Sequence, residues 1–139
     1  MPVTADHQPF PRERQPIVRI LAMPADTNPH GHIFGGWIMA QMDIAGGIVA
    51  ANRANGRVVT VAVTSMAFHK PVFVGDLVSC FADIEKVGNT SITVRVEVFA
   101  ERRRGEQVQC VKVTGAVIVY VAVTPEGAPR PVPAMETPR

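Results

Sequence analysis

The chain has few cysteines, little net charge and no long uninterrupted apolar run. Its two cysteines, Cys80 and Cys110, are too few for a disulfide framework or, on their own, for a four-ligand zinc site. Both lie in apolar, strand-like runs of the sequence. We therefore expect both to be buried free thiols.

The charge is too small to indicate a nucleic-acid partner. The 139 residues carry a formal net charge of +2, with a calculated pI of about 8.8. A dedicated nucleic-acid binder concentrates positive charge, so we expect no such partner, whereas a small anionic ligand is compatible. Hydrophobic residues make up 47% and charged residues 19%, which excludes a disordered chain. A chain of this length can bury one core.

No stretch has the pattern of a membrane span or a secretion signal. Residues 1–16 contain no apolar core of the kind that a signal peptide needs. The most apolar stretch, 33–51, includes Gln41, Asp43 and four glycines. An aspartate is costly inside a bilayer, so a buried helix is the better interpretation of this stretch. We expect a cytoplasmic protein without membrane association.

Prolines predict the limits of the folded domain. Proline has no backbone donor and a fixed φ angle, so clusters of it favour extended or loose chain. We predict a flexible tail at 1–15, one domain at 16–124 and a proline-rich tail at 125–139. The prolines on which this rests are Pro2, Pro9, Pro11, Pro16, Pro125, Pro129, Pro131, Pro133 and Pro138.

Hydrophobic periodicity predicts one helix and several strands. A turn-rich loop at 24–31 leads to a helix that starts at Gly36 and ends within 52–56. This helix is apolar on nearly every face, which predicts that other structure surrounds it. The pattern is typical of an α+β fold, with an antiparallel sheet curled around the helix and sheet edges that a dimer would cover. The expected strands are 17–23, 58–68, 77–86, 91–99 and 108–123, with a charged hairpin loop at 102–106.

Gly35 and Gly36 lie where the loop becomes the helix. Unpaired N–H groups and the positive end of the helix dipole meet at such a position, and glycine lets a ligand approach the backbone. This environment suits an anion, or an oxygen on which negative charge develops. Tight packing of the loop on the helix explains the glycine pair equally well.

Asp43 is the sharper indication of function. It lies two turns into an otherwise almost wholly apolar helix, where aspartate is a poor helix former. A buried carboxylate needs partners, or its protonation equilibrium shifts. Asp43 is therefore either a base or nucleophile that lines a cleft, or a structural residue paired with Arg53 or Arg57.

The histidines and the remaining cations give weaker indications. His32 lies beside the glycine pair and is a candidate for a functional role, whereas His30 and His69 are expected to be peripheral. No tight helical ligand spacing is present, so we expect no metal site. Arg57 and Lys70, together with the arginines at 102–104, could contact phosphates. Motifs of dinucleotide-binding, P-loop and α/β-hydrolase proteins are absent.

Six segments carry a resemblance to a known family. They are AMPADTN at 22–28, GHIFGGWIMAQMDIAG at 31–46, GRVVT at 56–60, FHKPV at 68–72, VGD at 74–76 and YVAVTPEG at 120–127. Together they resemble the bacterial YciA-type acyl-CoA thioesterases, which have the hotdog fold. The resemblance covers about residues 17–133. It implies a sheet wrapped around a central helix and a homodimer with one continuous sheet and active sites at the interface. It further implies a trimer of such dimers, a hexamer.

The resemblance also implies an activity and its residues. The substrate would be an acyl-CoA, and free CoA and a carboxylic acid would be released. The backbone N–H of Gly36 would stabilise the oxyanion, and Asp43 would act as general base on water or as nucleophile. His32 stands where relatives have Asp or Asn, and it would position water or contact the thioester.

The expected substrate contacts complete the implied site. Gly35 would lie against the substrate, and Arg57 and Lys70 would face the phosphates of CoA. No cofactor is expected, because CoA is part of the substrate.

Two other functions stay open at this point. A hotdog dehydratase or hydratase acting on 3-hydroxyacyl thioesters would use His32 with Asp43. That family, however, has His-Phe-Pro-Gly and a helix Glu, where this chain has His-Ile-Phe-Gly-Gly and Asp43. A non-catalytic acyl-CoA-binding module would have the same fold with a structural Asp43, and it would bind ligand without turnover.

Overall fold

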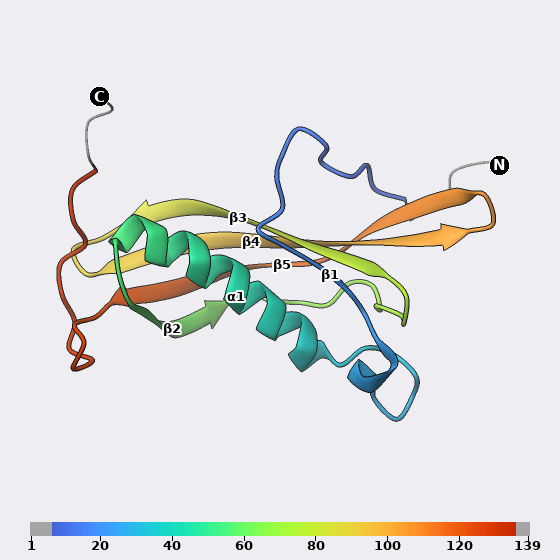
Figure 1. Cartoon of the computed structure of the whole chain (residues 1–139), viewed down its shortest axis with the longest axis horizontal. Coiled ribbons are helices and arrows are strands. Elements are labelled where there is room, and N and C mark those ends of the chain that lie inside the picture. The colour runs from blue at the N-terminus through green and yellow to red at the C-terminus, as the bar shows by residue number, and fades with distance from the viewer. Residues whose placement is uncertain (1–6, 136–139) are drawn as a thin grey trace.

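The computed structural model describes residues 7–135, which form one helix, α1, packed on one face of a five-stranded antiparallel sheet (Figure 1). The strand order is β1-β3-β4-β5-β2. This confirms the predicted α+β architecture. The elements are β1 (Val18–Leu21), the 3-10 turn η1 (Pro24–Asp26), α1 (Gly35–Ala54), β2 (Val58–Thr64), β3 (Leu77–Val87), β4 (Ser91–Arg104) and β5 (Gln107–Ala122).

The clean alternation in β4 builds the centre of the sheet. Ile92, Val94, Val96 and Val98 are fully buried and belong to the main core cluster, in which residues of α1 also lie. β4 pairs with β3 on one side and with β5 on the other. Because every second side chain of a strand points to the same face, this pattern fixes which face of β4 receives the helix.

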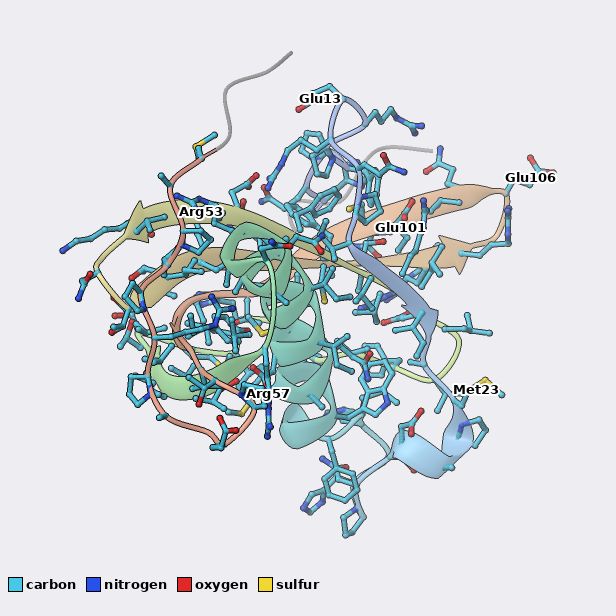
Figure 2. The ribbon with its side chains drawn as sticks, turned by 60° about the vertical axis from the view of Figure 1, so that its left-hand side comes forward. Glu13, Met23, Arg53, Arg57, Glu101 and Glu106 are labelled. Carbon is cyan, nitrogen blue, oxygen red and sulfur yellow. The ribbon has the colours of Figure 1, made fainter. Side chains whose placement is uncertain are left out.

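The β4–β5 hairpin is longer than the sequence predicts. The ladder continues to the pair formed by Arg104 and Gln107, so the predicted loop at 102–106 is mostly strand. Figure 2 shows Glu106 at the tip of this hairpin, far from the helix. Arg102 is therefore a strand residue.

One side of α1 packs on the sheet and the other is uncovered. Ile38, Met42 and Ala45 are buried, whereas Ile44 and Ile48 are 50% and 44% exposed. The composition predicts contacts around the whole helix, but the chain by itself covers one side only. Among the described residues, no helix is long and apolar enough to cross a membrane.

The edge strand β2 continues this uncovered surface. β2 pairs with β5 on one side only, and it contacts α1. An exposed apolar edge strand is a surface on which another chain can add. We use the name α1–β2 apolar face for the exposed apolar side chains of these two elements, which are Met39, Ile44, Ile48, Val59, Val61 and Val63.

The C-terminal segment closes the end of the helix. Asn55 adopts a left-handed conformation with φ of 52° and ends α1, one residue before the predicted break at Gly56. The guanidinium of Arg130 donates to the carbonyl of Ala54 at 2.9 Å, which places a positive charge at the negative end of the helix dipole. Val132 donates its N–H to Asn89 at 2.8 Å.

The N-terminal segment packs on the other side of the sheet. The ring of Phe10 lies 5.5 Å from that of Phe81 and 6.4 Å from that of Phe99, between ring centroids. Arg14 forms ion pairs with Asp83 and, at 2.9 Å, with Glu97. Figure 2 shows Glu13 on this segment above the sheet. The described parts of both predicted tails thus contact the domain, while residues 1–6 and 136–139 lie outside the described residues.

Both cysteines are free and buried, as the sequence predicts. Burial raises the pKa of the Cys80 thiol to about 12. Burial and the negative charge of Glu101 raise the pKa of Cys110 to about 11. Protonated thiols of this kind are poor nucleophiles, so neither cysteine is a candidate for covalent catalysis.

Candidate active site

The start of α1 is held by the loop that precedes it. Ile33 donates its N–H to Val72 and Phe34 donates to Asp26, each at 2.9 Å. Trp37 and Ile38 both donate to the carbonyl of Phe34, at 3.1 and 3.3 Å. The N–H of Gly36 has no acceptor among residues 7–135, so it is available at the positive end of the helix dipole.

The two glycines at this position serve different purposes. A Cβ built on Gly35 would lie 3.4 Å from the ring of Phe68, so Gly35 allows close packing of the loop on the helix. A Cβ built on Gly36 would meet nothing within 4 Å. The packing explanation therefore applies to Gly35, whereas Gly36 leaves its backbone open to whatever approaches from outside the chain.

Two hydroxyl groups hold the carboxylate of Asp43. Thr60, on β2, donates from Oγ1 to Asp43 Oδ1 at 2.7 Å. Tyr120, on β5, places its hydroxyl 3.0 Å from the same Oδ1 and 3.0 Å from the backbone carbonyl of Asp43. Sequence reasoning missed both partners; the available signal was a lone tyrosine at an inward position of an apolar strand.

Neither of the arginines considered for Asp43 pairs with it. Arg53 donates to the carbonyl of Pro133 at 2.6 Å, and Arg57 donates to that of Pro125 at 3.3 Å. Figure 2 shows these two arginines well apart from each other. The carboxylate of Asp43 is thus held by neutral donors, and the ion-pair explanation for its presence in the helix is wrong.

Gly46 makes room for the tyrosine. A Cβ built on Gly46 would lie 2.4 Å from the hydroxyl oxygen of Tyr120 and 3.1 Å from two of its ring carbons. A Cβ on the neighbouring Gly47 would lie 3.7 Å from the ring, which is ordinary contact. The hydroxyl of Tyr120 can therefore pass the helix and reach Asp43 only because residue 46 has no side chain.

This difference predicts opposite effects of two neighbouring substitutions. Gly46→Ala is expected to lower the free energy of unfolding by about 1–3 kcal/mol, because it overpacks the core against Tyr120. Gly47→Ala is expected to raise it by up to about 1 kcal/mol, because alanine favours the helix. Urea denaturation of both variants measures the two values. Equal changes in the two would contradict the packing described here.

His32 is exposed, and its ring contacts the loop that contains Phe73. The ring of His32 meets that of Phe73 edge-on, with 5.2 Å between centroids. The backbone N–H of His32 donates to Asn28 Oδ1 at 3.1 Å. The guanidinium of Arg102 lies 4.7 Å from the same Phe73 ring and donates to the buried Asp76 at 2.9 Å. The sequence predicts that Arg102 lies in a charged hairpin loop, but it lies on β4 and fixes the loop against which His32 packs.

The distance between Gly36 and Asp43 limits what one chain can do. The two residues are seven positions apart on α1 and so lie on nearly the same face of the helix. At 1.5 Å per residue, they are separated by about 10 Å along the axis. A carbonyl held by the N–H of Gly36 is thus about two helical turns away from Asp43 of the same chain.

Comparison with known proteins decides the family. A family model described as "Thioesterase superfamily" matches residues 30–106. The acyl-CoA thioester hydrolase YciA of Salmonella typhimurium is 53% identical over 118 residues, which cover 84% of this chain and 89% of the relative. The chain belongs to the thioesterase superfamily.

Solved structures of thioesterases agree with this assignment. A hexameric hotdog-fold thioesterase of Campylobacter jejuni is 46% identical, with a TM-score of 0.84 over 86% of this chain and 91% of that one. A hexameric thioesterase of Yersinia pestis is 51% identical, with a TM-score of 0.81 over 87% and 97%. The hotdog fold and the resemblance to YciA-type thioesterases are thereby confirmed.

In this thioesterase the two expected phosphate contacts lie far apart in the fold. Arg57 follows the C-terminal end of α1. Lys70 lies in the segment that covers the start of α1, where Phe68 contacts Gly35. The structure of one chain does not bring Arg57 and Lys70 together. The residues described contain no group of three or more His, Cys, Asp or Glu side chains placed to bind a metal ion.

Proposed function

We infer that this protein is an acyl-CoA thioesterase, which hydrolyses an acyl-CoA to free CoA and a carboxylic acid. The observation that carries this function is that α1 holds both an accessible helix N–H, at Gly36, and a carboxylate held by two hydroxyl groups, at Asp43. The first supplies a donor to a carbonyl oxygen and the second a proton acceptor for water. The similarity to YciA, over most of both chains, supports the acyl-CoA substrate.

The residues have separate roles in the proposed reaction. The N–H of Gly36 polarises the thioester carbonyl and stabilises the oxyanion. Asp43 takes a proton from water, whose oxygen forms the new bond to the carbonyl carbon. The carbon–sulfur bond then breaks, and the proton on Asp43 passes to the leaving thiolate. Attack by Asp43 itself, through an anhydride, is the alternative, which we consider less favoured.

We propose that the active site is completed by a second copy of the chain. One chain holds Gly36 and Asp43 about two helical turns apart, whereas two antiparallel copies of α1 can place Gly36 of one beside Asp43 of the partner subunit. The α1–β2 apolar face supports this arrangement, because pairing of two β2 edges covers it and forms a continuous sheet. A trimer of these dimers accounts for a hexamer of the kind described for the two related structures.

The same two-fold symmetry would bring together Arg57 and Lys70, which lie far apart within one chain. If two copies of β2 pair antiparallel about their middle, Arg57 at one end approaches the segment that follows the partner's β2. That segment carries Lys70, so Arg57 and Lys70 of different subunits converge near the start of a helix. We propose that they contact CoA phosphates there, beside Gly35. His32, whose ring is exposed, then positions water or contacts the thioester.

Further proposals concern the cofactor, the partners and the cellular location of the enzyme. The proposed chemistry uses backbone and side-chain groups of the chain only, so no resident cofactor is required. The low net charge supports neither a nucleic-acid nor a membrane partner. Two free thiols are typical of a reducing compartment, which supports a cytoplasmic location.

Release of thiol from a panel of acyl-CoAs tests the function. We expect turnover of short, long or aromatic acyl chains, measured with a thiol reagent and confirmed by detection of the carboxylic acid. Hydration of an enoyl-CoA without thiol release would instead indicate a hydratase. Binding of acyl-CoA in one-to-one proportion without any product would indicate a binding module.

A further inference from the structure

Tyr120 reaches the candidate base through the core. Its side chain is 1% exposed, and it belongs to the same core cluster as buried residues of α1. The space left by Gly46 lets the hydroxyl extend past the helix backbone to Asp43. A phenylalanine would fill the same core volume, so burial of the ring alone does not explain a hydroxyl at this place.

The hydroxyl of Tyr120 acts as a donor. Burial, the negative charge of Asp43 and the hydrogen bond to it all raise the pKa of Tyr120 above its usual value, so the phenol keeps its proton at neutral pH. That single proton faces two acceptors at 3.0 Å, which are Oδ1 and the backbone carbonyl of Asp43. The hydroxyl therefore ties the carboxylate to the backbone of its own residue.

The two oxygens of Asp43 are not equivalent. Oδ1 accepts hydrogen bonds from the hydroxyl groups of Thr60, at 2.7 Å, and Tyr120, at 3.0 Å. Oδ2 takes part in no hydrogen bond with any residue from 7 to 135. With one oxygen held from two strands, the rotation of the carboxylate is fixed and the other oxygen points in a set direction. Such control of orientation matters, because misplacement by about 1 Å can lower a rate by about 10²-fold.

We propose that Tyr120 is a positioning residue for catalysis, which with Thr60 fixes Oδ1 of Asp43 and so makes Oδ2 the oxygen that accepts the proton from water. Gly46 is part of the same arrangement, because the absence of a side chain there leaves the space that the hydroxyl of Tyr120 occupies. The proposal rests on the proposed role of Asp43 as the base. It concerns the geometry of the carboxylate and adds no further step to the reaction.

Steady-state kinetics of Tyr120→Phe tests the proposal. We expect kcat to fall by about 10- to 100-fold while KM stays within about twofold, because the substrate does not touch the phenol. In the Asp43→Asn background, Tyr120→Phe should cause no further loss, since a positioning residue acts only through its carboxylate. A merely structural tyrosine would lower activity by the same factor in both backgrounds.

Thr60 provides a second test that does not alter the core aromatic. Thr60→Ala is expected to lower kcat with little change in KM, and Thr60→Ser, which keeps the hydroxyl, is expected to restore it. If Tyr120→Phe unfolds, these two Thr60 variants still test whether the hydroxyl groups on Oδ1 position Asp43. Thr114→Val is the control for loss of a buried hydroxyl, because its Oγ1 donates to Ala67 at 2.6 Å and not to Asp43.

The outcomes separate the two proposals. Wild-type kcat in both Tyr120→Phe and Thr60→Ala, with Asp43→Asn inactive, would overturn the positioning role and leave Asp43 as the base. Full activity of Asp43→Asn would overturn the proposed function of Asp43 itself. A loss in Thr114→Val equal to that in Tyr120→Phe would assign the effect to stability and reject the positioning role.

Discussion

Asp43→Asn is expected to lower kcat for acyl-CoA hydrolysis by about 10³-fold, a typical contribution of a general base. The amide has nearly the shape of the carboxylate, and its oxygen can still accept from Thr60 and Tyr120. It cannot take a proton from water. The fold and the binding of substrate should therefore be kept while the chemical step is lost, which a thiol-release assay with saturating acyl-CoA measures.

The control for this substitution is an aspartate of the same chain that has no place in the site. Asp83 is exposed on β3 and pairs with Arg14, so Asp83→Asn should keep wild-type kcat. Thermal unfolding and size-exclusion chromatography of both variants show whether fold and assembly are intact. Activity of Asp43→Asn within a few-fold of wild type would remove Asp43 from the mechanism.

Mixing two inactive variants should restore activity if the site is shared between subunits. Gly36→Pro removes the N–H proposed as oxyanion donor, and proline is tolerated in the first turn of a helix. We expect this variant to lose about 10²- to 10³-fold in kcat. A mixed dimer of Gly36→Pro with Asp43→Asn has one site with both lesions and one site with neither.

Random exchange of equal amounts makes half of the dimers mixed, so about a quarter of wild-type activity should return. Mixing requires unfolding and refolding together, or co-expression with two different tags. Each variant mixed with a tagged copy of itself is the control and should stay inactive. No recovery in mixed dimers that are shown to form would mean that each site lies within one chain.

Much of the fold is predictable from local pattern. The alternation at 91–99 correctly predicts a strand, β4, and the glycine pair places the start of α1 to within one residue. Gly36 and Asp43 stand out because a helix chosen for stability alone would not contain them. Both signals are local, since they depend on a residue and its immediate neighbours in the sequence.

The partners of Asp43 are not predictable in this way. Tyr120 lies 77 positions from Asp43 in the sequence, and the two meet through the register of β5 under α1. Strand register depends on the whole sheet, so no local pattern shows which inward residue reaches the helix. The same holds for Arg102, which reads as one of three arginines at a hairpin tip but pairs with the buried Asp76.

The prolines predict a flexible tail at 1–15, and for a related reason they do not show that Phe10 packs on the sheet. Proline restricts the backbone, but it does not prevent neighbouring side chains from binding elsewhere on the domain. Phe10 joins Phe81 and Phe99 on the sheet face opposite the main core. That cluster needs residues from three distant segments, so the composition of residues 1–15 alone does not reveal it.

The order of strands in the sheet also determines when the site can form during folding. β3, β4 and β5 form two consecutive hairpins and can pair as soon as each strand is synthesised, whereas β2 must wait for β5, because Val58 pairs with Ala122. Contacts of large sequence separation form late. Thr60 and Tyr120 lie on these two strands, so a nascent chain acquires its reactive carboxylate geometry only after nearly all of it has left the ribosome.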